Sequence, residues 1–299
     1  MSAATLERLP DFIGIGPPRT GTTWLHEVLK GRVGLPRDHK ETDFFSRNFA
    51  NGLDWYRDYF RDCDPRLPVG EFSPTYFNSD ATPARIVESI PQCKIICTLR
   101  DPVDRAWSHW RLMVTNAWTR VPFKDAIESL REVRESGRYG TYLKQWLELF
   151  GRERVLVLIY DDLERDPQGF LDQTCDFIGI DRFDYRESPR GTERVHALPI
   201  APKYRQLARN ARKFGTWLNR NRFHRVYKVF RNSAVWRWCV ESGDRFQPPS
   251  AEVDAAVRER YRPEIELLEQ LIGRDLSAWK TPRGRVGAGI AASNVSIAV

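Results

Sequence analysis

The most informative part of the sequence is Phe12-Ile-Gly-Ile-Gly-Pro-Pro-Arg-Thr-Gly-Thr-Thr-Trp-Leu25. It begins as a short apolar run, continues as a Gly/Pro loop and ends where a helical pattern starts. We therefore predict a buried strand, a tight loop and a helix. Such a loop directs free backbone N–H groups past the helix N-terminus, where the helix dipole favours a phosphate-like anion. The stretch predicts an anion site at the end of a strand.

The loop departs from the Walker A pattern of ATP-binding proteins at its cation. Gly16 and Gly21 have the Walker spacing, but Thr22 stands where that pattern has lysine, and Thr23 follows it. The cation of this loop is Arg19 instead. We therefore expect anion binding without the usual ATP chemistry.

Length and composition are those of an ordinary globular protein. The chain has 299 residues, of which 41% are hydrophobic and 29% charged, enough for one large α/β domain or two small ones. We expect neither a signal peptide nor a membrane span, because the N-terminus lacks the first pattern and no apolar run approaches about 20 residues. The five scattered cysteines form no Cys-x-x-Cys pair, which indicates a reducing compartment and no structural zinc. We expect a cytoplasmic protein.

Positive charge gathers in the C-terminal third. The net charge is +7 and the pI is near 9.2. Between Ile200 and Arg231, ten residues are Lys or Arg and none is Asp or Glu. The stretch is either a solvated helical face or a surface that attracts an anionic ligand, an acidic polymer or a membrane.

Aromatic residues are interleaved with this charge at roughly helical spacing. The spacing favours packing for most of them: Phe214, Trp217, Phe223, Tyr227, Phe230, Trp236 and Trp238. A basic, aromatic stretch over residues 200–240 is also compatible with peripheral contact with a membrane. No nucleic-acid motif accompanies the charge, so we expect no nucleic-acid partner.

Three apolar runs predict buried parallel strands over residues 12–15, 94–99 and 155–160. Helical patterns lie between and after them, over residues 22–30, 82–89, 103–114, 123–135, 142–150, 166–178 and 250–271. This alternation predicts the α/β class, with a three-layer doubly wound parallel sheet. We expect a single domain over residues 1–280 and a disordered tail over residues 281–299.

A second motif, Leu99-Arg-Asp-Pro-Val-Asp-Arg-Ala-Trp-Ser-His109, follows the middle strand. Asp101 is predicted to cap the next helix, with Ser108 about two turns into it. Arg100 and Ser108 can bind a phosphate together, although Arg100 could instead pair with Asp101 or Asp104. Ligands of such sheets bind above the carboxyl ends of the strands, so this motif and the first loop should share one crevice.

Together the two motifs resemble the sulfotransferases that use 3′-phosphoadenosine 5′-phosphosulfate (PAPS), which implies a P-loop-NTPase-like sulfotransferase fold. The resemblance runs from Phe12 to about Lys280, and the ending over residues 271–280 looks like that of bacterial members. It implies that the 5′-phosphosulfate is held by Arg19, Thr20, Gly21, Thr22 and Thr23, and the 3′-phosphate by Arg100 and Ser108. Trp24 would lie against the adenine, or else belong to the core. Arg190 and Gly191 lie where relatives close over the nucleotide, and would touch the 3′-phosphate.

The segments His39-Lys-Glu-Thr-Asp-Phe-Phe45 and Gly70-Glu-Phe-Ser-Pro-Thr-Tyr76 resemble the branch that includes the heparan sulfate sulfotransferases and many bacterial enzymes. This resemblance implies that Glu41 is the general base. The following Phe44 and Phe45 suggest that the segment dips into the fold, so we expect Glu41 to be partly desolvated. Three residues compete for the role of base: His39, His109 and Glu71, the last of which we expect to orient its neighbours.

The resemblance implies transfer of a sulfuryl group from PAPS to an acceptor hydroxyl or amine, leaving adenosine 3′,5′-bisphosphate and needing no metal. Arg19 replaces the family's loop lysine and would stabilise charge on the leaving phosphate. The acceptor would be a carbohydrate, a glycolipid or a small molecule; Phe72, where heparan-branch relatives carry lysine, weakens a transfer of their specificity.

Two rival classes remain at this point, and the oligomeric state is not predicted. One is a P-loop kinase, with Asp161 and Asp162 as Mg²⁺ ligands, against which the missing Walker lysine counts. The other is a non-catalytic module that binds acidic polymers or membranes, which would not need Arg100, Ser108 and Glu41 together.

Overall fold

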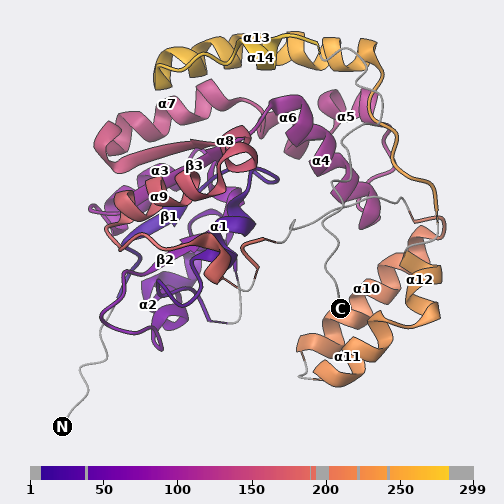
Figure 1. Ribbon diagram of the computed structural model, residues 1–299, viewed down its shortest axis with the longest axis horizontal. Coiled ribbons are helices and arrows are strands. Elements are labelled where there is room, and N and C mark those ends of the chain that lie inside the picture. Colours follow the sequence, from indigo (N-terminus) through magenta and orange to yellow (C-terminus); the bar gives the residue numbers. More distant parts are fainter. Residues whose placement is uncertain are drawn as a thin grey trace.

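The computed structural model describes residues 8–37, 40–188, 190–192, 202–220, 223–240 and 243–282. At its centre lies a parallel sheet with the strand order β2-β1-β3-β4 (Figure 1). Its strands are β1 Phe12–Gly14, β2 Gly70–Phe72, β3 Lys94–Leu99 and β4 Val155–Ile159. The parallel α/β sheet predicted from the sequence is confirmed, and β2 is an addition to the three predicted strands.

Strand β2 pairs with β1 through an exchange of large and small residues. Phe12 lies opposite Gly70, and Gly14 lies opposite Phe72. A Cβ on Gly70 would come 2.2 Å from the ring of Phe12, and one on Gly14 would come 2.2 Å from the ring of Phe72. Each ring thus fills the space that a glycine leaves, which fixes the register of β2 although the strand is short.

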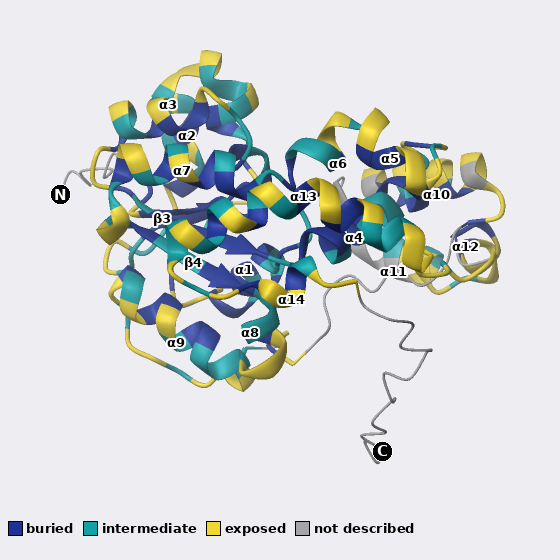
Figure 2. Cartoon of the chain, turned by 90° about the horizontal axis from the view of Figure 1, so that it is seen from above, coloured by how far each residue is buried: buried dark blue, intermediate teal, exposed yellow. Residues whose placement is uncertain are grey.

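Helices cover both faces of the sheet, and each face has its own apolar core. On one face Ile95 and Cys97 of β3 pack with residues of α3, α4, α7 and α13. On the other face Ile96 packs with α1, α8 and α9. Figure 2 shows the buried residues gathered in the sheet and on the helix faces turned toward it. The helices of the body are α1 Thr22–Val28, α2 Gly52–Arg57, α3 Thr82–Ser89, α4 Pro102–Thr115, α5 Phe123–Ser129, α6 Arg131–Glu135, α7 Tyr139–Phe150, α8 Tyr160–Arg165, α9 Pro167–Ile178, α13 Ala251–Ile272 and α14 Ser277–Lys280.

One predicted helix is broken. The pattern over residues 123–135 predicted a single helix, but Leu130 has an extended backbone (φ −104°, ψ 102°) and separates α5 from α6. Its side chain packs against the apolar core beneath α4 and α7. The break is explained by this tertiary contact, which the local pattern does not contain.

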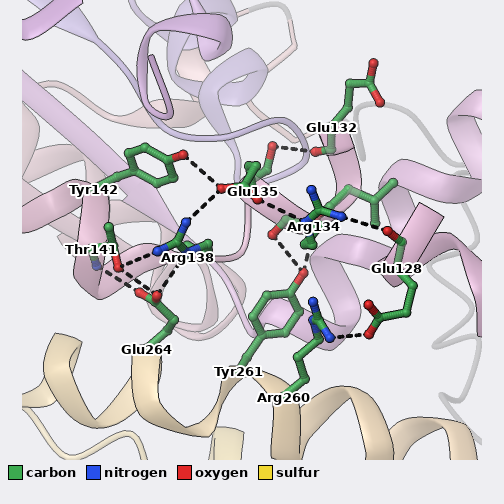
Figure 3. Close-up of polar contacts among 12 residues, drawn as sticks. Glu128, Glu132, Arg134, Glu135, Arg138, Thr141, Tyr142, Arg260, Tyr261 and Glu264 are labelled. Carbon is green, nitrogen blue, oxygen red and sulfur yellow. Dashed lines mark hydrogen bonds and ion pairs between the residues drawn. The ribbon is translucent and has the colours of Figure 1, made fainter. Parts of the chain in front are cut away.

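Helix α13 returns from the C-terminal region to cover α7 (Figure 3). Glu264 accepts hydrogen bonds from the backbone N–H of Thr141 at 2.8 Å and from Nε of Arg138 at 3.2 Å. The hydroxyl of Tyr261 donates to the carbonyl of Arg134 at 3.0 Å. A Cβ on Gly140 would lie 2.7 Å from Cβ of Leu267, so the two helices approach closely at that glycine. These contacts make α13 part of the α/β body.

Three helices form a unit set apart from the sheet (Figure 1): α10 Arg205–Arg220, α11 His224–Arg231 and α12 Ala234–Val240. Their small core contains Ala208, Trp236, Cys239 and Val240. Most of the aromatic residues predicted to pack do contact another ring, in the pairs Phe214–Trp217, Trp217–Phe223, Phe214–Phe230, Phe230–Trp236 and Tyr204–Trp238. The three helices nevertheless bury only their facing sides. Four of the seven named aromatics are exposed: Phe214, Trp217, Phe223 and Trp238.

Among the described residues, no helix is both long and apolar enough to cross a bilayer. The tail predicted over residues 281–299 lies outside the described residues from residue 283 onward.

Candidate active site

The loop between β1 and α1 is locked against β3. Arg19 has φ 80° and Gly21 has φ 103°, both in the left-handed region, which a non-glycine residue such as Arg19 adopts only when its surroundings hold it there. The hydroxyl of Thr20 shares a 2.8 Å hydrogen bond with that of Thr98 on β3. A Cβ on Gly16 would come 2.0 Å from the Thr98 hydroxyl, so only glycine fits there. The loop predicted from the sequence therefore has one enforced shape.

Positive charge gathers where this loop meets the motif after β3. Nε of Arg19 donates to Oγ of Ser108 over 2.8 Å, so the two motifs meet. Burial first, and then the charges of Arg100 and Arg111, lower the pKa of Arg19 to about 10. The guanidinium of Arg100 lies 4.3 Å above the ring of Tyr160. Like charges held this close favour a bound anion, because it would relieve their repulsion.

Arg111 and Tyr160 are absent from the predicted site residues. Arg111 lies one helical turn beyond Ser108 on α4, a spacing that puts both on one side of the helix and could have revealed it. Tyr160 begins α8 directly after β4, at the carboxyl edge of the sheet where ligands bind.

Asp101 caps α4 as predicted. Its Oδ1 accepts from the backbone N–H groups of Val103 at 2.9 Å and Asp104 at 3.2 Å. Its Oδ2 accepts from the buried Arg258 of α13 at 2.8 Å. The carboxylate of Asp101 thus binds backbone N–H groups of α4 and Arg258, while the guanidinium of Arg100 lies over the ring of Tyr160. This arrangement favours the phosphate-binding interpretation of Arg100 over a structural pair with Asp101.

Lys40 is a further cation that the sequence prediction missed. Its Nζ donates to Oγ1 of Thr23 at 3.0 Å and of Thr22 at 3.3 Å, and contacts Oε1 of Glu41 at 3.2 Å. Burial lowers the pKa of Lys40. An ammonium group thus stands over the threonines that end the loop, although the loop itself has no lysine. Its place directly before Glu41 was the signal available in the sequence.

Glu41 is less buried than expected. Its side chain is 42% exposed, whereas Phe44 and Phe45 are fully buried. The chain turns inward only after Glu41, at Asp43 (φ 49°), where a π-helical turn over Phe44–Asn48 begins. The predicted desolvation of Glu41 is therefore wrong, since the carboxylate lies at the surface beside Lys40. Its role as general base stays a prediction.

Glu71 of β2 is the buried carboxylate of this region. Its Oε2 accepts from the hydroxyls of Thr42 at 2.6 Å and Ser73 at 3.0 Å. Its Oε1 accepts from the hydroxyls of Tyr56 at 2.6 Å and Tyr76 at 2.8 Å. Burial raises the pKa of Glu71, although these four hydrogen bonds oppose the change. Through Thr42, this carboxylate fixes the residue next to Glu41, which matches the orienting role expected for it.

A loop after α9 is tied to α1. The indole Nε1 of the buried Trp24 donates to the carbonyl of Gly191 at 2.9 Å, and its ring packs edge-on against Phe170. Nη1 of Arg190 lies 3.4 Å from Oε2 of Glu27. Burial of Trp24 favours the packing role over the adenine contact. Contacts of Trp24, Arg190 and Gly191 with a nucleotide stay predictions.

Of the two histidines named as alternative bases, His109 is poorly suited to the role. Burial first, then the charges of Arg105 and Arg19, lower the pKa of His109 to about 3. So weak a base is poorly matched to proton abstraction near neutral pH. His39 lies outside the described residues.

The aspartates considered as Mg²⁺ ligands hold the C-terminal region instead. Oδ2 of Asp161 accepts from the indole of Trp279 at 3.0 Å. Oδ1 of Asp162 accepts from Nη2 of Arg274 at 2.8 Å and of Arg165 at 2.5 Å. Within the part of the chain that the structure describes, no group of three or more His, Cys, Asp or Glu residues is arranged to hold a metal ion.

Comparison with known proteins identifies the family. The sulfotransferase domain model matches residues 9–194, and the chain belongs to this family. The resemblance drawn from the two motifs is thereby confirmed, and the match favours a sulfotransferase over the kinase alternative. The matched residues include the loop with Arg19, the Lys40–Glu41 pair, Glu71, and Arg100 with Ser108.

Curated relatives include two bifunctional heparan sulfate N-deacetylase/N-sulfotransferases. The human form 3 is 31% identical over 210 residues, which cover 62% of this chain and 24% of the relative. The mouse form 4 is 30% identical over 210 residues, with the same coverage of 62% and 24%. The matched region thus spans about a quarter of these relatives' length. A sulfotransferase structure from Alicyclobacillus acidocaldarius has a TM-score of 0.66 at 22% identity, covering 92% of this chain and all of that one, and shows a shared fold.

Proposed function

We propose that the chain transfers a sulfuryl group from PAPS to an acceptor hydroxyl or amine. The observation that carries this proposal is the meeting of the two motifs. The 2.8 Å bond from Arg19 to Ser108, with the charges of Arg100 and Arg111 close enough to lower the pKa of Arg19, supports one extended anion site. A donor with phosphates at both the 3′ and 5′ positions needs such an extended cationic site. Family membership supports the same reaction class.

The Lys40–Glu41 pair would supply two further roles, the general base and a second cation beside the leaving phosphate. Glu41 would take the proton of the acceptor while the acceptor atom forms its bond to sulfur. The bond from sulfur to the 5′-phosphate oxygen breaks, and its electron pair stays on the phosphate. Lys40 and Arg19 would neutralise the charge that grows there, as preorganised cations do in phosphoryl transfer. The contact between Lys40 and the loop threonines supports this division of work.

We propose that the acceptor is a carbohydrate, either free or on a lipid. The curated relatives are named for heparan sulfate, which supports a saccharide carrying hydroxyl and amine groups. The exposed position of Glu41 also suits an acceptor that approaches from solvent and is larger than the site.

The test pairs binding with turnover in the full-length chain. Binding of adenosine 3′,5′-bisphosphate is measured by calorimetry. Incubation with sulfur-labelled PAPS and a cell extract identifies the acceptor as the compound that becomes labelled. Turnover is then measured as the rate of label transfer to that acceptor. Glu41→Gln should keep bisphosphate binding and lose about 10²- to 10⁴-fold in turnover. Lys40→Met should lose about 10²- to 10³-fold in turnover and also bind the bisphosphate more weakly.

The exposed pair Lys144–Glu148 on α7 gives a matched control, with Nζ and Oε1 3.8 Å apart. Lys144→Met and Glu148→Gln should leave both measurements unchanged. Full turnover in Glu41→Gln would show that the base is misassigned. Failure of the wild-type chain to bind the bisphosphate would overturn the proposed donor.

A further inference from the structure

The α10–α12 unit carries a surface that the transfer reaction does not explain. Its buried side chains form one small core, in which Ala208 of α10 meets Trp236, Cys239 and Val240 of α12. Other large apolar side chains of these helices are exposed, and Figure 2 colours much of the unit as exposed.

Large apolar side chains stand on this outward surface. Leu207, Phe214 and Trp217 follow one another at spacings of seven and three residues, so they share one side of α10. The rings of Trp217 and Phe223 stack with centroids 6.0 Å apart, and those of Phe214 and Trp217 with centroids 5.9 Å apart. Trp217 is 52% exposed and Val229 of α11 is 72% exposed. An apolar cluster this open is typical of an interaction surface.

Cations border the cluster. Arg209 and Lys213 lie one helical turn apart on α10, and both are exposed. The sequence from Ile200 to Arg231 contains ten Lys or Arg residues and no acidic residue. Exposed aromatic rings beside a run of positive charge are the composition of a helix that lies in the plane of a bilayer surface. There the rings enter the boundary of the acyl chains, and the cations meet anionic headgroups.

We propose that the outward face of α10 and α11 docks the protein peripherally on an anionic lipid bilayer. The charge complementarity would serve an acidic polysaccharide as well, and a sugar ring can stack on Trp217, but such a ligand has no use for the exposed aliphatic side chains of Leu207 and Val229. A bilayer uses both the apolar cluster and the cations. The proposal does not depend on the proposed transfer reaction, because the unit forms a separate core.

The test is co-sedimentation of the full chain with vesicles. Phosphatidylcholine vesicles are compared with vesicles that also contain about one third phosphatidylglycerol, at about 0.1 M and about 0.5 M salt. We expect binding only to the anionic vesicles, weakened at the higher salt. Arg209→Glu with Lys213→Glu should reduce the affinity about tenfold or more. Trp217→Ser with Val229→Ser should also reduce it about tenfold, without any change in charge.

A matched control and a competing polymer make the test decisive. Lys144→Glu with Leu149→Ser alters an exposed cation and an exposed apolar residue on α7, and should bind vesicles like the wild type. Retention on immobilised heparin should fall in the charge variant and stay unchanged in the apolar variant. Circular dichroism checks that each variant folds. If the variant with Arg209→Glu and Lys213→Glu does not fold, the single variant Lys213→Gln takes its place. The proposal is overturned if wild type does not sediment with anionic vesicles, or if the apolar variant sediments as wild type does.

Discussion

In the α/β body, charged side chains such as Glu71 and Arg258 are fully enclosed, and each has several partners. In the α10–α12 unit, cations such as Arg209 and Lys213 face outward instead. The first arrangement uses charge to fix positions, because a buried charge tolerates only the geometry that satisfies it. The second leaves charge free to act at long range on a partner. The same residue types thus build a site in one region and an attractive surface in the other.

The largest expected effect comes from removing a buried cation of the body. Arg258 bonds Asp101 at 2.8 Å, Asp254 at 2.8 Å and the carbonyl of Trp279 at 2.7 Å. Arg258→Met leaves the buried Asp101 without this partner and should lower the free energy of unfolding by about 3–5 kcal/mol. Urea denaturation measures the change. Arg262→Met, on the exposed side of the same helix, should match the wild type; an equal loss in both would contradict the comparison.

An intermediate effect is expected from pH, through two histidines buried in the body. Burial is the main cause that lowers the pKa of His26 to about 4 and of His109 to about 3. The unfolded chain takes up a proton at each near pH 6.5, while the folded chain does not until the pH reaches the lower value. Stability should therefore fall as the pH drops below about 6.5, by about 2 kcal/mol for each histidine between about pH 7.5 and pH 5.

Urea denaturation at the two pH values measures this loss. His26→Gln and His109→Gln should each remove about 2 kcal/mol of the pH dependence, because glutamine does not titrate. A pH dependence that survives in the double variant would assign it to carboxylates instead.

The smallest effect on the body should come from the core of the α10–α12 unit. Trp236 packs edge-on against Phe230 inside that unit. Trp236→Ala should open α10–α12 locally and change the unfolding free energy of the body by less than about 1 kcal/mol. Hydrogen exchange measures this: amides of α10 and α12 should lose protection while those of β3 keep it. Loss of protection in both regions would mean that they fold as one unit.

The sequence predicted the parallel sheet well because β1, β3 and β4 are continuous apolar runs next to clear turns. Strand β2 escaped prediction because Gly70–Phe72 has no period of its own; its register depends on Phe12 and Gly14 across the sheet. The break between α5 and α6 at Leu130 was not predicted for the same reason, because it is caused by packing against residues distant in the sequence. Local pattern thus identifies elements that bury a regular face, and misses those shaped by contacts with other elements.

The candidate site was predicted in part for a related reason. Arg19, Arg100 and Ser108 belong to motifs with fixed spacing, so their meeting follows from strand topology. Lys40 reaches the loop from a different segment, and no spacing in the sequence announces that contact. The exposure of Glu41 was mispredicted because the inward turn begins two residues later than the aromatic pair suggested.

The four hydrogen bonds around Glu71 have a consequence for redesign of the enzyme. They tie Thr42 to strand β2, and the same segment carries Lys40, whose ammonium contacts the loop threonines. The segment is thus held in place by side chains around Glu71. Acceptor-side segments from other family members could be exchanged here, provided that the graft keeps a hydroxyl at position 42 and the tyrosines at positions 56 and 76. A graft that lacks these hydroxyl groups would leave the buried Glu71 without hydrogen-bond donors. The grafted segment would then be misplaced even if its reactive residues were kept.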